Sequence, residues 1–237
     1  MSCAMSFGEL NIPSSRAFWD DCDEDEPSQQ SGEKLELKYV AGAETVGMPC
    51  DLLLLIEGLA IADFAEKTLL NDSNSGKICD IPAKHSTLHR LKTKSRTILL
   101  AILEEDLTSS GEVAELLEPY AKLAQQVVTV TIKAKVDYKT ENIAKVRDEI
   151  IFWRGINAQL QHVQPLEPPN FIAGVAAGIA SWRENQNLQV SSYVAYVDNV
   201  ALDALVSKPV LKLLEEIGLE CATSYSPKPK DDSHLYS

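Results

Sequence analysis

Short apolar runs, each bounded by polar or glycine residues, constrain the fold of this chain more than any other feature. They occupy residues 51–57, 97–103 and 127–132, and leucine, isoleucine and valine dominate all three. Runs of this length without polar alternation are typical of strands that are buried on both faces, as in a parallel sheet. We therefore predict central strands at these three positions and a fourth at residues 192–197.

Amphipathic segments separate these strands and predict helices. The helices are expected at residues 61–69, 109–123, 142–153, 171–185 and 207–217. Strands that alternate with helices indicate βαβ units with right-handed crossovers. The predicted fold class is α/β, a three-layer α/β/α domain with a mostly parallel central sheet.

Local signals refine the ends of these elements. Ser109 and Glu112 form a capping-box pattern, and Pro119 is expected to kink or break the helix that follows. Asp198 or Asn199 can cap the next helix, and Ser207 restarts a helix that ends at Gly218.

Two further segments have weaker patterns. Leu35, Leu37 and Tyr39 alternate with charged residues and predict an edge strand. Residues 71–94 are polar and predict loops, with a short helical or strand piece at residues 88–92.

The charge distribution predicts three parts. Residues 1–34 include six acids within residues 20–26, so they are expected to form a disordered acidic arm. The arm acts as a solvated linker or, alternatively, contacts a basic partner. Residues 35–220 are predicted to form one α/β domain, and residues 221–237, with Pro227 and Pro229 among charged residues, a flexible tail.

Bulk composition excludes several classes of function. The net charge of −13 argues against binding to nucleic acid or to anionic membranes, which both need a positive surface. No apolar run approaches the roughly 20 residues that span a bilayer, and no signal-peptide pattern is visible. Five scattered cysteines without a C-x-x-C pair indicate reduced thiols of a cytoplasmic or nuclear protein.

Motifs for catalysis or metal binding are weak. His85 and His89 are spaced to share a helix face, but they lack a third ligand and are interpreted as ordinary surface histidines. Ser75-Gly76-Lys77 resembles the end of a phosphate loop without its first glycine. We therefore expect no catalytic residue, no metal and no cofactor.

Polar residues after the third strand form the strongest candidate site in the domain. Asp137, Tyr138, Lys139 and Thr140 follow a strand end, where α/β folds place their ligands. A Lys–Tyr pair there can be catalytic, but no second cluster converges on it. We favour a structural turn or an interface.

The chain ends in Leu235-Tyr236-Ser237, a hydrophobic residue, a tyrosine and a free carboxylate. Leu235 can fill an apolar slot, and the Tyr236 ring adds contact area with a hydroxyl that hydrogen-bonds. The carboxylate of Ser237 can pair with a buried lysine of a partner. The tail, on the extended tether before it, therefore predicts a docking motif, and the alternative is a frayed terminus that binds nothing.

Five segments carry a resemblance to a known family. They are residues 7–9 before the acidic run, residues 136–140, residues 166–170 before a small-residue helix, residues 193–198, and the tail at residues 235–237. Their order and spacing resemble the proteasome assembly chaperone 1 family over nearly the full length of the chain.

The resemblance implies a non-enzymatic chaperone whose fold is similar to nucleoside-phosphorylase-like enzymes. It implies a heterodimer with proteasome assembly chaperone 2, which binds the outer face of the proteasome α ring. The pair would promote ring assembly and prevent off-pathway ring association and premature regulator binding. The Leu235–Ser237 tail would dock in a pocket between α subunits. The implied location is the cytoplasm, the nucleus or the surface of the endoplasmic reticulum.

Two alternatives remain open. One is an α/β phosphorylase- or hydrolase-like enzyme, and the other is a regulator that caps the mature proteasome. Heterodimer formation also has a sequence argument, because the helix at residues 175–182 and the final helix are expected to expose surplus apolar surface. Gly174 and Gly178 allow close packing of the first of these helices on the sheet or on a partner.

Overall fold

The computed structural model describes residues 34–42, 47–70, 75–93, 96–141, 146, 148–198, 202–221 and 225. From Leu35 onward, these residues belong to one compact unit. Residues 1–33 and the Leu235–Ser237 motif lie outside the described residues. The division into arm, domain and tail therefore stays a prediction.

One sheet organises the described part of the chain. Its strands are β1 (Lys38–Tyr39), β2 (Cys50–Glu57), β3 (Ser75–Ile81), β4 (Ser86–Lys92), β5 (Thr97–Leu103), β6 (Ala124–Ala134), β7 (Ile151–Ile156), β8 (Gln164–Pro165) and β9 (Val190–Val197). Their spatial order is β1-β3-β4-β5-β2-β6-β9-β7-β8. The four central strands, β5, β2, β6 and β9, are parallel, and antiparallel strands flank them on both sides.

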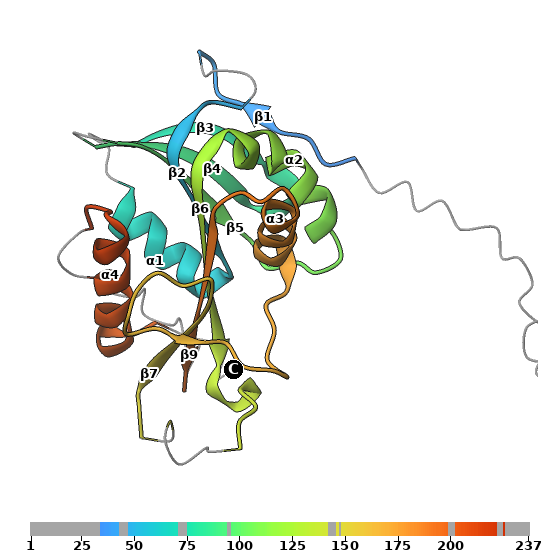
Figure 1. The fold of residues 1–237 in the computed structure, drawn as a ribbon. Helices are drawn as coiled ribbons and strands as arrows, with labels where there is room; N and C mark the ends of the chain where they lie inside the picture. Colours follow the sequence, from blue (N-terminus) through green and yellow to red (C-terminus); the bar gives the residue numbers. More distant parts are fainter. Residues whose placement is uncertain are drawn as a thin grey trace, which may run out of the picture. The chain divides into compact units, whose positions relative to one another are not determined.

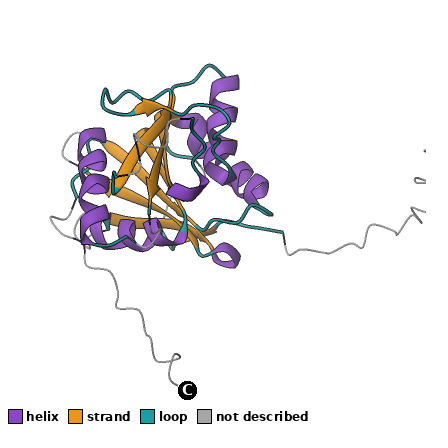
Figure 2. Ribbon diagram, turned by 90° about the horizontal axis from the view of Figure 1, so that it is seen from below, coloured by secondary structure: helices purple, strands orange, loops and turns teal. Residues whose placement is uncertain are grey.

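Helices cover both faces of this sheet (Figures 1 and 2). They are α1 (Leu59–Leu69), α2 (Ser110–Leu123), α3 (Gly174–Asn185) and α4 (Ala204–Ile217), with short 3-10 turns at Pro82–Lys84 and Lys135–Asp137. Helices α1 and α4 lie on one face, and α2 and α3 lie on the other (Figure 1). The predicted three-layer α/β/α architecture is confirmed. None of the described helices is long and apolar enough to cross a bilayer.

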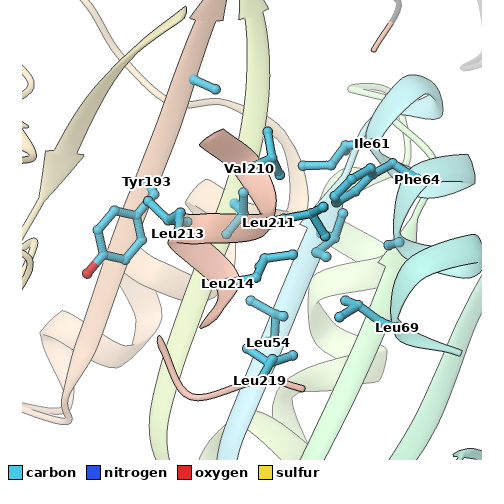
Figure 3. Close-up of a cluster of buried hydrophobic side chains, with 14 of the residues drawn as sticks. Leu54, Ile61, Phe64, Leu69, Tyr193, Val210, Leu211, Leu213, Leu214 and Leu219 are labelled. Atoms are coloured by element: carbon cyan, nitrogen blue, oxygen red, sulfur yellow. The ribbon is translucent and has the colours of Figure 1, made fainter. Parts of the chain in front are cut away.

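The face beneath α1 and α4 carries the largest of three buried hydrophobic clusters (Figure 3), and the second largest covers the opposite face of the sheet. Leu54 in β2 and Tyr193 in β9 supply part of the sheet side, while Phe64 of α1 and Val210 and Leu214 of α4 pack above them. Because alternate residues of a strand point to opposite faces, the consecutive leucines of β2 feed both clusters. This is why the strand needs no polar alternation.

The opposite face packs against α2 and α3. Val175 and Ile179 of α3 are buried there, and a Cβ placed on Gly178 would lie 3.3 Å from the Cβ of Ala114 in α2. The small residues of α3 therefore serve packing within this chain. Among the described residues, no large hydrophobic side chain of α3 is strongly exposed, and α4 exposes Leu205 alone. The expectation of surplus apolar surface on these two helices is wrong. Helix α3 buries its apolar side chains against the sheet and α2, and α4 buries its own in the cluster that it shares with the sheet and α1.

Residues 75–93 are the described part of the segment predicted as loops, and they differ from that prediction, because β3 and β4 form an antiparallel hairpin there. The alternative of a strand piece at residues 88–92 is confirmed, since these residues lie in β4. Strand β4 continues the sheet by pairing with β5. The hairpin strands mix buried and exposed positions, which gives them a polar composition. Ser75, Gly76 and Lys77 lie in β3 and form no phosphate loop.

The predicted helix at residues 142–153 is wrong for the part that is described. Residues 148–150 are not helical, and Ile151 begins β7. Strand β7 pairs antiparallel with β9, with Trp153 opposite Ala195. The apolar spacing in this segment serves sheet pairing, and local propensity is overridden by tertiary contacts.

Helix α2 begins at the predicted position, but the Ser109 side chain does not form the predicted capping hydrogen bond. The Ser109 hydroxyl donates to Asp106 at 2.9 Å and accepts no bond from the helix. Pro119 lies within an uninterrupted helix, so the predicted break is wrong. Tyr120 and Ala121, both buried, hold the last turn in place.

Helix α4 starts three residues earlier than predicted. The Asp203 carboxylate accepts hydrogen bonds from the amides of Leu205 and Val206, both at 2.8 Å, and is the N-cap. Ser207 is therefore inside the helix. Asp198 pairs with Lys135 at 2.9 Å and is not the N-cap of α4, and Asn199 lies outside the described residues.

Candidate functional site

Three of the segments that carry the family resemblance lie together at the carboxyl ends of β6 and β9. They are residues 136–140, 166–170 and 193–198. The Asn170 side chain accepts a hydrogen bond from the Lys139 amide and donates to the Lys139 carbonyl, both at 2.8 Å. It also donates to the Glu167 carbonyl at 2.8 Å. A single amide thus joins the loop at residues 136–140 to the segment at residues 166–170.

Tyr138 forms the buried centre of this junction. Its hydroxyl donates to Glu167 at 2.5 Å and accepts from Arg154 at 2.8 Å. Its ring lies 4.9 Å from the Phe152 ring and 4.8 Å from the Tyr196 ring, between centroids. Burial, together with the bond to Glu167, raises the pKa of Tyr138. The residue is engaged as a structural tie.

Arg154 supports the same junction from β7. It is 7% exposed, and its guanidinium lies 4.8 Å from the centre of the Phe152 ring and 5.1 Å from that of Tyr138. The Nε atom of Arg154 lies 3.7 Å from the nearest carboxylate oxygen of Glu167, so the two charges attract each other without a direct hydrogen bond. Thr140 lines a second depression of about 420 Å³ with Arg154 and Glu167.

Asp137 and Lys139 have a different role from Tyr138, because both side chains are exposed. They line a cavity of about 720 Å³ at the carboxyl ends of the central strands. Thr131, Lys133 and Glu57 also line this cavity. The structure thus separates the predicted Lys–Tyr pair, with the tyrosine buried below and the lysine at the cavity.

Glu57 occupies the N-terminus of α3 from the end of β2. Its two carboxylate oxygens accept from the amides of Val175 and Ala176 at 2.9 and 2.8 Å. Gly174 is required beside it, because φ is +80° and a Cβ would lie 2.2 Å from a Glu57 oxygen. Burial raises the pKa of Glu57, while the two amides oppose that shift.

This arrangement limits what the cavity can do chemically. A helix N-terminus attracts anions, and in this chain the Glu57 carboxylate already fills that position. Within the described ranges, no group of three or more His, Cys, Asp or Glu side chains is placed to hold a metal ion. His85 lies in a turn and His89 in β4, so they share no helix face. Burial lowers the pKa of His89 to about 4, which keeps it neutral.

Sequence reasoning missed Glu57 and Thr131, which form the floor of the cavity. The available signal was an acid at the end of a buried strand, directly before Gly58. Glu57 and Thr131 are opposite each other in the parallel pairing of β2 and β6. The tail residues Leu235, Tyr236 and Ser237 lie outside the described residues, and their role stays a prediction.

Comparison with known proteins informs the fold. No protein-family model matches the sequence, and no curated protein matches it significantly. Among solved structures, the chain resembles Pyrococcus furiosus PbaB, an archaeal proteasome activator, with a TM-score of 0.54 and 13% identity over 79% of this chain and 90% of PbaB.

Two further similar structures belong to proteins of unknown function. The Mycobacterium tuberculosis protein has a TM-score of 0.52 and 11% identity over 79% of this chain and 78% of that protein. The Corynebacterium glutamicum protein has a TM-score of 0.50 and 12% identity over 78% of this chain and 82% of that protein. This chain therefore shares its fold with these three structures.

Proposed function

We propose that this protein is a proteasome assembly chaperone that binds α subunits of the core particle. The carrying observation is that the family-like segments at residues 136–140, 166–170 and 193–198 converge in the folded chain. Segments far apart in sequence that build one junction support the resemblance more than isolated motifs do. The fold shared with an archaeal proteasome activator adds to this support.

The finer parts of the proposal rest on the sequence. The protein acts as a heterodimer with proteasome assembly chaperone 2, promotes assembly of the α ring and prevents off-pathway ring association and premature regulator binding. Its Leu235-Tyr236-Ser237 tail docks in a pocket between α subunits. It works in the cytoplasm, in the nucleus or at the surface of the endoplasmic reticulum.

Affinity capture of the tagged full-length protein, followed by mass spectrometry, tests the proposal. The tag belongs at the N-terminus, so that the Ser237 carboxylate stays free. Capture of α subunits with few β subunits is expected. A matched chain that lacks residues 235–237 should keep the partner chaperone and lose α subunits. Capture of neither α subunits nor a related chaperone would refute the assembly function.

A second candidate is a regulator that caps the mature proteasome. One observation favours it, since PbaB is described as an activator. The same capture experiment separates the two candidates, because a regulator would bring down whole mature particles with stoichiometric β subunits.

We further propose that the domain has no catalytic activity. Two of the buried polar groups at the strand ends, the Tyr138 hydroxyl and the Glu57 carboxylate, are engaged in structural hydrogen bonds. The check is an assay of nucleoside phosphorolysis and phosphate-ester hydrolysis. Turnover that is lost in Lys139→Ala would support the enzyme alternative instead.

A further inference from the structure

The 720 Å³ cavity has a floor rich in hydrogen-bond acceptors. Glu57 is 4% exposed, and each of its carboxylate oxygens accepts one amide bond. A carboxylate oxygen can accept more than one hydrogen bond, so Glu57 keeps accepting capacity. Glu105 follows the neighbouring strand β5 and also lines the cavity. Its negative charge acts on Glu57, because it contributes to the raised pKa of that residue.

Thr131 adds a buried polar atom without a protein partner. Its residue is 7% exposed, and its hydroxyl has no hydrogen-bond partner in the described part of the chain. Because Thr131 stands opposite Glu57 in the β2–β6 pairing, the two side chains share one face of the sheet and line the same cavity. A buried hydroxyl without a partner costs free energy, which a bound donor would recover.

The rim of the cavity is apolar and exposed. Leu107 is 64% exposed and Phe171 is 67% exposed, and both line the opening. Val136, which is 82% exposed, is adjacent in sequence to the lining residue Asp137. Large exposed apolar side chains around a partly polar pocket are characteristic of protein-binding sites.

Two lysines also line the cavity, and their contacts decide which charge it attracts. The Lys133 ammonium donates to the Phe171 carbonyl at 2.7 Å and lies 4.8 Å from the centre of the Phe171 ring, so it is already engaged. Lys139 is exposed. Against these two cations stand three carboxylates, those of Glu57, Glu105 and Asp137. The lining therefore has an excess of one negative charge, in a chain whose net charge is −13.

We propose that this cavity receives an arginine side chain of a partner protein, with Leu107 and Phe171 contacting the apolar residues around it. Arginine donates five N–H groups and accepts none, which matches the Thr131 hydroxyl and the Glu57 and Glu105 carboxylates. Its aliphatic stem suits the apolar rim, and its planar head can stack on an aromatic ring. The site goes beyond the tail-mediated docking proposed above and does not depend on it.

A peptide titration of the full-length protein tests this site. The probe is a blocked tripeptide, acetyl-Leu-Arg-Leu-amide, and its matched control carries citrulline, which keeps the shape and removes the charge. We expect the arginine peptide to bind roughly tenfold more tightly, since hydrogen bonds to charged groups are about twice as strong as neutral ones. Binding should weaken as salt increases. A glutamate peptide should not bind.

Variants locate the binding to this cavity. Thr131→Val and Glu105→Gln should each weaken binding of the arginine peptide several-fold. Only Glu105→Gln should leave the citrulline peptide nearly unchanged, because citrulline keeps N–H donors for the Thr131 hydroxyl but lacks the charge that Glu105 attracts. Thr129→Val is the matched control for the hydroxyl, because Thr129 is buried in the same strand without a hydrogen-bond partner in the described chain and does not line the cavity. Glu112→Gln controls for loss of one exposed acid.

Three results would overturn the proposal. They are equal affinity for the arginine and citrulline peptides, no binding of the arginine peptide at millimolar concentration, and arginine-peptide affinity unchanged in both Thr131→Val and Glu105→Gln. Thermal unfolding of each variant excludes misfolding as the cause of weaker binding. Because the peptide titration contains no proteasome subunit, a negative result would refute this site and leave the proposed chaperone function untouched.

Discussion

At the scale of single residues, Arg183 shows how one buried charge can join three elements. It is completely buried at the end of α3, and its guanidinium donates to the carbonyls of Ala121, Ala124, Gln125 and Gln189 at 2.5–3.1 Å. These carbonyls belong to the end of α2, the start of β6 and the residue before β9. The positive charge also suits the C-terminus of α2.

We predict that Arg183→Met lowers the free energy of unfolding by about 3–5 kcal/mol, because several buried carbonyls lose their donor at once. Urea denaturation of the full-length protein measures the change. Arg183→Lys should recover only part of it, since an ammonium has three donors and a different geometry. Lys122→Met, an exposed change on α2, should stay within about 0.5 kcal/mol of wild type. A similar value for Arg183→Met would refute the structural role.

Glu57 predicts a pH dependence of stability. Burial raises its pKa above 4.5 in the folded protein, so the folded state holds the proton more tightly than the unfolded state. Ionisation of Glu57 therefore opposes folding increasingly as pH rises above 4.5. In Glu57→Gln this contribution is absent. We expect the stability of wild type relative to Glu57→Gln to fall between pH 4.5 and pH 7.

The measurement is urea unfolding of both proteins at several pH values in this window. Glu112→Gln, an exposed change, serves as the reference for general charge effects. The absolute stability of Glu57→Gln is expected to be lower at pH 4.5, because its amide nitrogen cannot accept the hydrogen bond from the Ala176 amide. A wild type that gains stability over the variant with rising pH would contradict the assignment.

At the scale of elements, the junction between residues 136–140 and 166–170 depends on one side chain. Asn170 satisfies both backbone groups of Lys139. We predict that Asn170→Ala leaves the Lys139 amide without its acceptor and speeds its hydrogen exchange by roughly tenfold or more, as expected for a lost local contact of more than about 1 kcal/mol. Exchange mass spectrometry of peptides that cover residues 136–140 detects the change.

The control for this junction is Gln161→Ala, an exposed change between β7 and β8. Exchange in the central strand β2 should be unchanged in both variants, because its hydrogen bonds lie within the sheet. Unaltered exchange at residues 136–140 in Asn170→Ala would mean that Tyr138 and its contacts hold the loop without the amide.

At the scale of the whole molecule, the root of the tail is anchored on the domain. Tyr225 packs its ring 5.1 Å from that of Phe64, and its hydroxyl donates to Asp63 at 2.8 Å. Twelve residues follow Tyr225 in the sequence, and they lie outside the described residues. If they form the flexible tail that the sequence predicts, they would span roughly 20 Å, enough for the terminal motif to reach a separate protein surface.

We predict that one residue appended after Ser237 strongly weakens binding to α rings. The extension moves the terminal carboxylate by about 3.5 Å, and leaving a pocket lysine unpaired costs about 3–5 kcal/mol, more than 100-fold in affinity. Tyr236→Ala should weaken binding less, and Ser237→Ala only slightly. A titration of each variant heterodimer against isolated α rings measures these effects.

Heterodimer formation is the internal control for these tail variants. If the proposed heterodimer forms, each variant should still give a one-to-one complex with proteasome assembly chaperone 2 by light scattering, because the changes lie in the predicted tail and leave the domain intact. Equal α-ring affinity for wild type and for the extended chain would show that the tail is a bystander.

The sequence alone determined the fold class and the central strands. Apolar runs such as Leu52–Ile56 can be buried on both faces only in a sheet covered by helices, so composition and length suffice to predict them. The short edge strand at Lys38–Tyr39 also followed from local alternation. Helix α1 was predicted from the spacing of its apolar residues. This spacing is a property of the segment itself and does not depend on distant contacts.

Only the tertiary structure decided the remaining elements and the site. Strand β7 depends on pairing with β9, far along the chain, and its own sequence indicates a helix. The β3–β4 hairpin is completed by pairing with β5, and its polar sequence indicates loops apart from a short helical or strand piece at residues 88–92. Asp137 to Thr140 were identified as a candidate site, but the separate roles of Tyr138 and Lys139 depend on Glu167 and Asn170, about 30 positions away. Glu57 and Thr131 lie side by side in the cavity floor because the register of β2 and β6 places them opposite each other. The sequence of either strand alone does not specify that register.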